Sequence, residues 1–73
     1  MPAEHRFDPR DELLDLLLRK VDQDPYPSTT MMDMIEEMLN REHVEAYARI
    51  LMAKVSADNY PSLDLIARVK ALG

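Results

Sequence analysis

The feature that most restricts the fold is a repeat inside the chain, with an offset of 34 residues. When residues 17–28 (LLRKVDQDPYPS) are placed over residues 51–62 (LMAKVSADNYPS), 7 of the 12 positions are identical. Average residue usage gives about one identity in such a window. The apolar pattern continues beyond it at four pairs of positions: Met31/Leu65, Met32/Ile66, Ile35/Val69 and Met38/Leu72. The sequence therefore predicts a tandem duplication, with units at about residues 8–40 and 41–73.

The first unit reads as a helix, a short turn and a second helix. Asp8 is a good N-cap and Pro9 suits the first helical position, so a helix is predicted over residues 9–23. The prolines of residues 24–27 (DPYP) disfavour helical geometry in the residues before them and end this helix. Ser28 then serves as the N-cap of a helix over residues 29–39, with Asn40 at its C-terminal end.

The second unit repeats this order, with helices predicted over residues 41–57 and 63–72 and the stop sequence DNYP between them. Short turns make neighbouring helices antiparallel, so the predicted fold is all-α, a small helical bundle of two αα-hairpins. A chain of 73 residues supports one hydrophobic core, and we expect a single domain over residues 1–73 with residues 1–7 disordered.

Composition excludes several classes of protein. The absence of cysteine excludes a disulfide framework and a thiolate metal site. The net charge of −5 argues against direct binding to nucleic acid, because Lys and Arg carry most phosphate contacts. No apolar run approaches the roughly 20 residues of a membrane span, and no secretory signal is evident. We therefore expect a cytoplasmic protein that binds neither nucleic acid nor membrane.

Catalytic and metal motifs are sparse. The chain has no Gly-rich phosphate loop, no evident nucleophile–base pair and no Glu-x-x-His spacing, so we expect no enzyme and no cofactor. His43 is expected on the solvated face of the third helix, and His5 falls in the N-terminal residues. Asp22 and Asp24 begin an alternation typical of a calcium loop, but Pro27 occupies the position of its glycine, which argues against calcium binding.

The two turns carry the most distinctive motif, Asp-x-Tyr-Pro-Ser, and two interpretations of it are open. In the structural one, the serine caps the next helix and the tyrosine ring folds onto the adjoining hairpin. In the functional one, Tyr26 and Tyr60 are paired binding residues on one face, an idea that rests on their repetition alone.

The predicted second helix is rich in methionine. Met31, Met34 and Met38 share one face with apolar neighbours, and this face fits core packing, a partner groove or a Cu(I) site. In the first helix, Leu13 and Leu16 widen the apolar stripe beyond what one neighbouring helix covers. This surplus predicts self-association, in the simplest case a homodimer.

The 34-residue period equals that of tetratricopeptide repeats, but both copies lack the landmark residues of that family. The twice-occurring Asp-x-Tyr-Pro-Ser between Leu13 and Leu72 resembles the small all-helical domains of unknown function found in actinobacteria. The resemblance implies a bacterial cytoplasmic protein and supplies no functional residues.

We expect a non-catalytic protein-interaction or regulatory module that works through protein contacts. Its expected surface comprises Tyr26, Met31, Met34, Met38 and Tyr60. One alternative is a metal or small-ligand binding protein that uses the methionines or His43. Another is a nucleic-acid-associated regulator such as a small antitoxin, which requires arginines gathered on one face.

Overall fold

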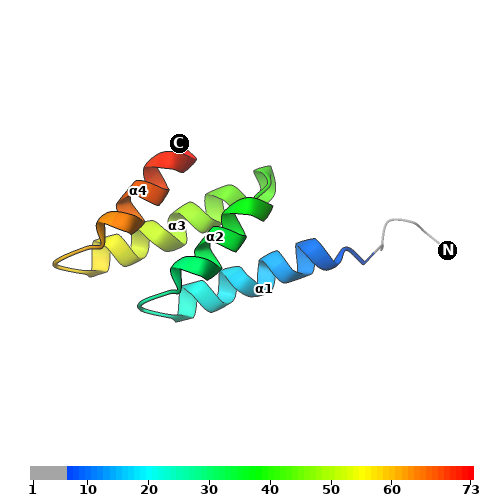
Figure 1. Cartoon of the computed structure of the whole chain (residues 1–73), viewed down its shortest axis with the longest axis horizontal. Helices are drawn as coiled ribbons and strands as arrows, with labels where there is room; N and C mark the ends of the chain where they lie inside the picture. The colour runs from blue at the N-terminus through cyan, green and yellow to red at the C-terminus, as the bar shows by residue number, and fades with distance from the viewer. Residues whose placement is uncertain (1–6) are drawn as a thin grey trace.

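The computed structural model describes residues 7–73, which form four α-helices and no strand. These are α1 (Pro9–Gln23), α2 (Thr29–Met38), α3 (Arg41–Ala57) and α4 (Leu63–Leu72), shown in Figure 1. The all-α prediction is confirmed, and three helices have the predicted bounds. The expected disorder of residues 1–7 concerns residues that, apart from Phe7, lie outside the described part of the chain.

The helices begin where capping side chains accept backbone hydrogen bonds. In α1, Oδ1 of Asp8 accepts from the backbone N–H of Arg10 at 3.0 Å, and Pro9 occupies the first helical position. Asp11 and Glu12 lie in the first turn, next to the positive end of the helix dipole. The N-terminal signals in the sequence therefore act as predicted.

Asn40 has a different role from the predicted one. Its Oδ1 accepts from the backbone N–H of His43 at 3.0 Å, so it is the N-cap of α3 rather than the end of α2. Helix α2 ends at Met38, with Leu39 in non-helical geometry after it. The amide side chain suits either end of a helix, and only the chain direction after Leu39 decides between them.

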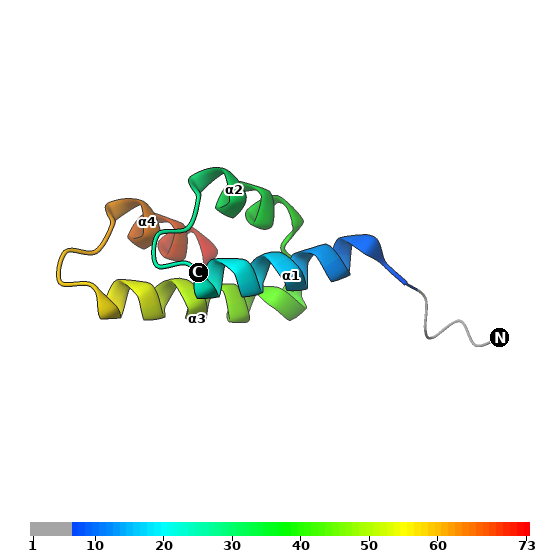
Figure 2. The same ribbon diagram turned by 90° about the horizontal axis from the view of Figure 1, so that it is seen from below.

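The two hairpins lie side by side in the same orientation (Figure 1). Helix α1 packs against α2, α3 packs against α4, and α1 and α3 join the hairpins. Seen from below, α1 and α3 form one layer and α2 and α4 form the other (Figure 2). Because α1 and α3 run in the same direction, the turns at residues 24–28 and 58–62 lie at the same end of the molecule.

A core of apolar side chains lies between the hairpins. Its members are at most 8% exposed and come from all four helices: Leu14, Leu18, Val21, Met32, Ile35, Tyr47, Leu51 and Leu65. Each full burial of such a side chain contributes about 1.5–3 kcal/mol relative to an exposed one. The core therefore holds both hairpins in one unit.

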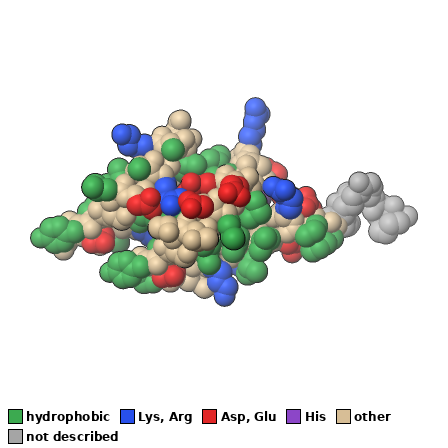
Figure 3. Space-filling model, in the orientation of Figure 1, with side chains coloured by type: hydrophobic (Ala, Val, Ile, Leu, Met, Phe, Trp, Pro, Cys, Tyr) green, Lys and Arg blue, Asp and Glu red, His purple; other side chains and the backbone are tan. Residues whose placement is uncertain are grey.

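An ionic cluster joins α2 to α4 on the surface that faces the viewer in Figure 3, where acidic and basic side chains meet between these helices. The Arg68 guanidinium donates to Asp33 at 2.9 Å, Glu36 at 2.8 Å and Asp64 at 2.8 Å. The arginine side chain is 11% exposed. These contacts raise the pKa of Arg68, with the hydrogen bond to Asp64 as the largest cause and burial as an opposing one.

Candidate functional site

The two Asp-x-Tyr-Pro-Ser turns have matching backbone geometry. Asp24 Oδ1 accepts from the backbone N–H of Tyr26 at 2.9 Å, and Asp58 Oδ1 accepts from that of Tyr60 at 3.0 Å. Such Asx turns fix the chain direction two residues after the aspartate. The backbone of each tyrosine is therefore held at the tip of its turn by the hydrogen bond from its N–H to the aspartate two residues earlier.

The serines complete the two turns. Ser28 Oγ accepts from the backbone N–H of Met31 at 3.2 Å, and Ser62 Oγ accepts from that of Leu65 at 3.3 Å. The backbone angles of the two serines agree within a few degrees, at φ −61°, ψ 133° and φ −62°, ψ 129°. The predicted caps are confirmed, and the local chemistry of one turn is that of the other.

The structural interpretation expects the tyrosine rings to fold onto the hairpins, and in the structure they do not. Tyr26 is 83% exposed and Tyr60 is 91% exposed, and hydrophobic side chains project at the tips of both turns (Figure 3). The proline that follows each tyrosine favours extended backbone at the tyrosine. Since their rings are exposed, these tyrosines contribute little to the core.

A groove of about 380 Å³ lies between the first turn and the C-terminal end of α3. Pro25 and Tyr26 line it from the turn, and apolar α3 side chains line the opposite side, among them Ile50. The charged residues Asp22, Lys54 and Asp58 also line it. The end of the molecule with the two turns therefore combines exposed aromatic rings, a shallow groove of mixed polar and apolar lining, and negative charge.

Lys54 crosses this end and fixes the two hairpins to each other. Its Nζ donates to the backbone carbonyl oxygens of Asp22 at 3.1 Å and Asp24 at 2.6 Å. A cation at the C-terminal end of a helix satisfies carbonyls and interacts favourably with the dipole. The sequence places Lys54 in the last turn of its own helix, and no local pattern shows that it binds the carbonyls of α1 instead.

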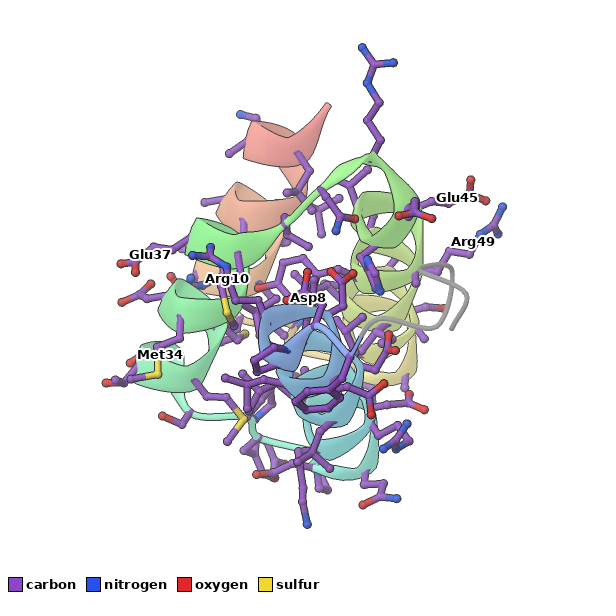
Figure 4. The ribbon with its side chains drawn as sticks, turned by 90° about the vertical axis from the view of Figure 1, so that its right-hand side faces the viewer. Asp8, Arg10, Met34, Glu37, Glu45 and Arg49 are labelled. Atoms are coloured by element: carbon purple, nitrogen blue, oxygen red, sulfur yellow. The ribbon has the colours of Figure 1, made fainter. Side chains whose placement is uncertain are left out.

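The methionines of α2 divide between core and surface. Met31 and Met38 are partly buried against the core, whereas Met34 is 53% exposed. Figure 4 shows Met34 and Glu37 pointing outward on the side of α2 away from α3. Met31 lies in the first turn of α2, next to the first tyrosine turn, whereas Met34 points outward from the helix. The five predicted interaction residues therefore do not form one surface.

His43 is not on a solvated face, which corrects the sequence-based expectation. Its side chain is 17% exposed, with Nε2 at 2.8 Å from Asp15 Oδ1 and Nδ1 at 2.7 Å from Asn40 Oδ1. Asp15 belongs to α1, so this histidine links the two hairpins. In the described part of the chain Asp15 contacts His43 rather than Arg19, which lies four positions later on α1.

Two of the remaining expectations concern metal and nucleic acid. Among residues 7–73, no group of three or more His, Asp or Glu side chains is arranged to hold a metal ion. Arg68 is enclosed by carboxylates, and Arg49 pairs with Glu45 at 2.7 Å on the outer face of α3 (Figure 4). Neither arginine presents isolated positive charge to a phosphate backbone.

Fold and site together define a small all-α protein of two like-oriented hairpins with paired aromatic turns. Comparison with known proteins finds no matching family model, no matching curated protein and no matching solved structure. None of the helices in residues 7–73 has both the length and the apolar character that crossing a bilayer requires.

Proposed function

We propose that this chain is a non-catalytic protein-interaction module that binds its partner through the end carrying Tyr26 and Tyr60. The observation that carries the proposal is the pair of exposed rings on two turns of the same geometry. Tyrosine is enriched among the residues that dominate binding energy, because its large ring buries much area and loses few rotamers. Two such rings at one end of a small domain have no role in its core.

The turns also support the proposal because they are already ordered. Each has an Asx turn before the proline and a serine cap after it, and Lys54 fixes the first turn to α3. A binding loop that is rigid before association loses less conformational entropy when it binds. The rings are therefore presented on a prepared framework.

The charge around the rings favours a partner segment that contains arginine. Asp22, Asp24 and Asp58 are exposed at the same end. The ammonium group of Lys54 there donates to backbone carbonyl oxygens. An arginine pairs with a carboxylate and also stacks on a tyrosine ring. An adjoining apolar residue fits the groove beside Ile50.

The test is capture of partners by the immobilised full chain, with quantitative comparison of wild type and the Tyr26→Ala/Tyr60→Ala double variant. Phe7→Ala is the matched control, since Phe7 is 73% exposed and shortly precedes α1, whose N-terminal end lies opposite the turns in Figure 1. We expect the double variant alone to lose specific proteins, with thermal unfolding unchanged. Equal capture by all three chains would overturn the proposal.

Two further measurements separate the alternatives. Photo-crosslinking from position 60 should join the chain to the same protein that the double variant loses. Stoichiometric uptake of Cu(I), Zn(II) or Ca(II) in equilibrium dialysis would instead favour the metal-binding alternative. A shift of labelled DNA or RNA at low salt would favour the nucleic-acid alternative.

A further inference from the structure

The second hairpin carries an open apolar groove of about 240 Å³ between α3 and α4. Its apolar lining consists of Met52, Val55, Ile66 and Val69. This groove is separate from the tyrosine turns, and Met52 is 48% exposed in it. The groove therefore leaves apolar side chains of the second hairpin open to another element.

The repeat identifies what covers the corresponding surface of the first hairpin. The residues 34 positions earlier are Leu18, Val21, Met32 and Ile35, with exposed fractions of 7%, 0%, 2% and 0%. All four belong to the core between the hairpins, where the second hairpin packs on the first. The same face is therefore covered in one hairpin and open in the other.

The covering face is repeated as well. The second hairpin contacts the first through Tyr47, Leu51, Lys54 and Arg68, which are buried in the core or bonded to residues of the first hairpin. The residues that correspond to them in the first hairpin are Leu13, Leu17, Lys20 and Met34. Leu13 is 44% exposed and Met34 is 53% exposed, while Leu17 is partly buried against the core, so this face leaves apolar surface open at Leu13 and Met34.

We propose that a second copy of the chain stacks head to tail on the first, with the first hairpin of one copy covering the groove on the second hairpin of the other. This contact repeats between molecules the packing that joins the hairpins within one molecule. Lys20 of one copy then donates to the backbone carbonyls of Ser56 and Asp58 in the other, as Lys54 donates to those of Asp22 and Asp24.

The differences between the repeats are complementary across this contact. Within the chain, Arg68 pairs with Asp33 and Glu36. In the contact between copies, Met34 replaces the arginine, and Ala67 and Lys70 replace the two acids. The cation and both of its carboxylate partners are thus lost together.

The same holds for the tyrosine of the core. Tyr47 donates to Glu36 within the chain, whereas Leu13, which has no hydroxyl group, meets Lys70 in the contact between copies. No buried donor or carboxylate is left without a partner by either exchange. The lysine stem also covers apolar surface while its ammonium group reaches water.

The proposed contact joins two different faces, so it is heterologous. In a stack, the groove stays free at one end and the covering face at the other. Association therefore continues beyond a dimer. We expect the weight-average mass in sedimentation equilibrium to rise steadily above 8.5 kDa between about 1 µM and 1 mM of the full chain. A monomer throughout this range, or a mass that stops at the dimer, would overturn the proposal.

Complementation between two variants tests the contact directly. Met52→Glu blocks the groove. Leu16→Glu blocks the covering face, since Leu16 corresponds to Ile50, which packs against the core in the second hairpin. Both residues are exposed enough for the fold to remain, which circular dichroism checks. Each variant alone should stay monomeric, while an equimolar mixture should form a species of about twice the 8.5 kDa of one chain. No complex in the mixture would refute the heterologous contact.

Two controls complete the experiment. Leu63→Glu, at an 81% exposed position outside both faces, should associate like wild type. Tyr26→Ala/Tyr60→Ala should also associate normally, which separates this inference from the proposed function.

Lys20→Met should weaken association about tenfold, whereas Arg19→Met, with the same loss of charge one residue away, should not. Equal affinity of these two variants would refute the role of Lys20.

Discussion

The hydroxyl of Tyr47 donates a 2.6 Å hydrogen bond to Glu36 from a ring that has no exposed surface. The same Oε2 atom of Glu36 accepts from Arg68 at 2.8 Å. One carboxylate therefore joins α2, α3 and α4 at the edge of the core. Burial first and the bond to Glu36 second raise the pKa of Tyr47 above its ordinary value.

Replacement of Tyr47 by phenylalanine removes this hydrogen bond and leaves the ring in place. Because Glu36 keeps Arg68 as a partner, we expect Tyr47→Phe to lower the free energy of unfolding by about 1 kcal/mol. Tyr47→Ala also removes the buried ring and should cost about 3–5 kcal/mol. Urea unfolding followed by circular dichroism at pH 7 measures both, and equal stability of wild type and Tyr47→Phe would contradict the prediction.

Stability should fall at alkaline pH because of this tyrosine. The folded pKa of Tyr47 lies above the unfolded value of 10.0, so above about pH 10 the unfolded chain loses a proton that the folded chain keeps. The stabilisation is complete below the unfolded pKa and is lost as the pH rises toward the folded one. Between these values the contribution falls by about 1.4 kcal/mol for each pH unit.

Denaturant unfolding at pH 9, 10 and 11 measures this slope. Tyr47→Phe is the control, because it removes the titrating group and keeps the ring. In the variant, the free energy of unfolding should fall less steeply with pH, by the contribution of Tyr47. Identical slopes for the two chains would mean that the loss of stability at high pH has another origin.

The helices were predictable because their signals are local. Asp8, Pro9, Ser28 and Ser62 act within one turn of the residues they cap, and the prolines restrict only their neighbours. The identity of the two turns also follows from sequence, because each Asx turn closes within three residues. Local chemistry of this kind needs no knowledge of how the hairpins pack.

The contacts between the hairpins were not predictable, because they depend on the packing of α1 against α3. His43 reads as a surface residue until Asp15 is placed beside it, 28 positions away in the chain. Lys54 reads as a cation for its own helix, yet it binds carbonyls 30 and 32 positions earlier. The exposure of Tyr26 likewise depends on where the neighbouring hairpin lies.

Arg68 should contribute more to stability than an ordinary surface arginine. Arg68→Met leaves Asp33, Glu36 and Asp64 close together without their shared cation, so we expect a loss of about 1.5–3 kcal/mol in the free energy of unfolding. Arg49→Met is the matched control, since it also breaks an ion pair between residues four positions apart on a helix. In that pair Arg49 and Glu45 are each 72% exposed. Exposed pairs of this type are worth about 0.3–0.5 kcal/mol. Thermal or urea unfolding of the two variants should therefore differ clearly, and similar losses would show that the cluster contributes no more than a surface pair.

Lys54 and Lys20 lie 34 positions apart, at corresponding places in the two hairpins, and should differ in effect. Lys54→Met removes the donor to the carbonyls of Asp22 and Asp24, and we expect a loss of about 1.5–3 kcal/mol, since these are hydrogen bonds from a charged group. Lys20 is exposed and makes no such bond within the described chain, so Lys20→Met should change stability by less than about 0.5 kcal/mol. Both measurements belong at low micromolar concentration, where the proposed association between chains would add least. An equal loss for the two variants would show that the carbonyl contacts of Lys54 do not hold the first turn against α3.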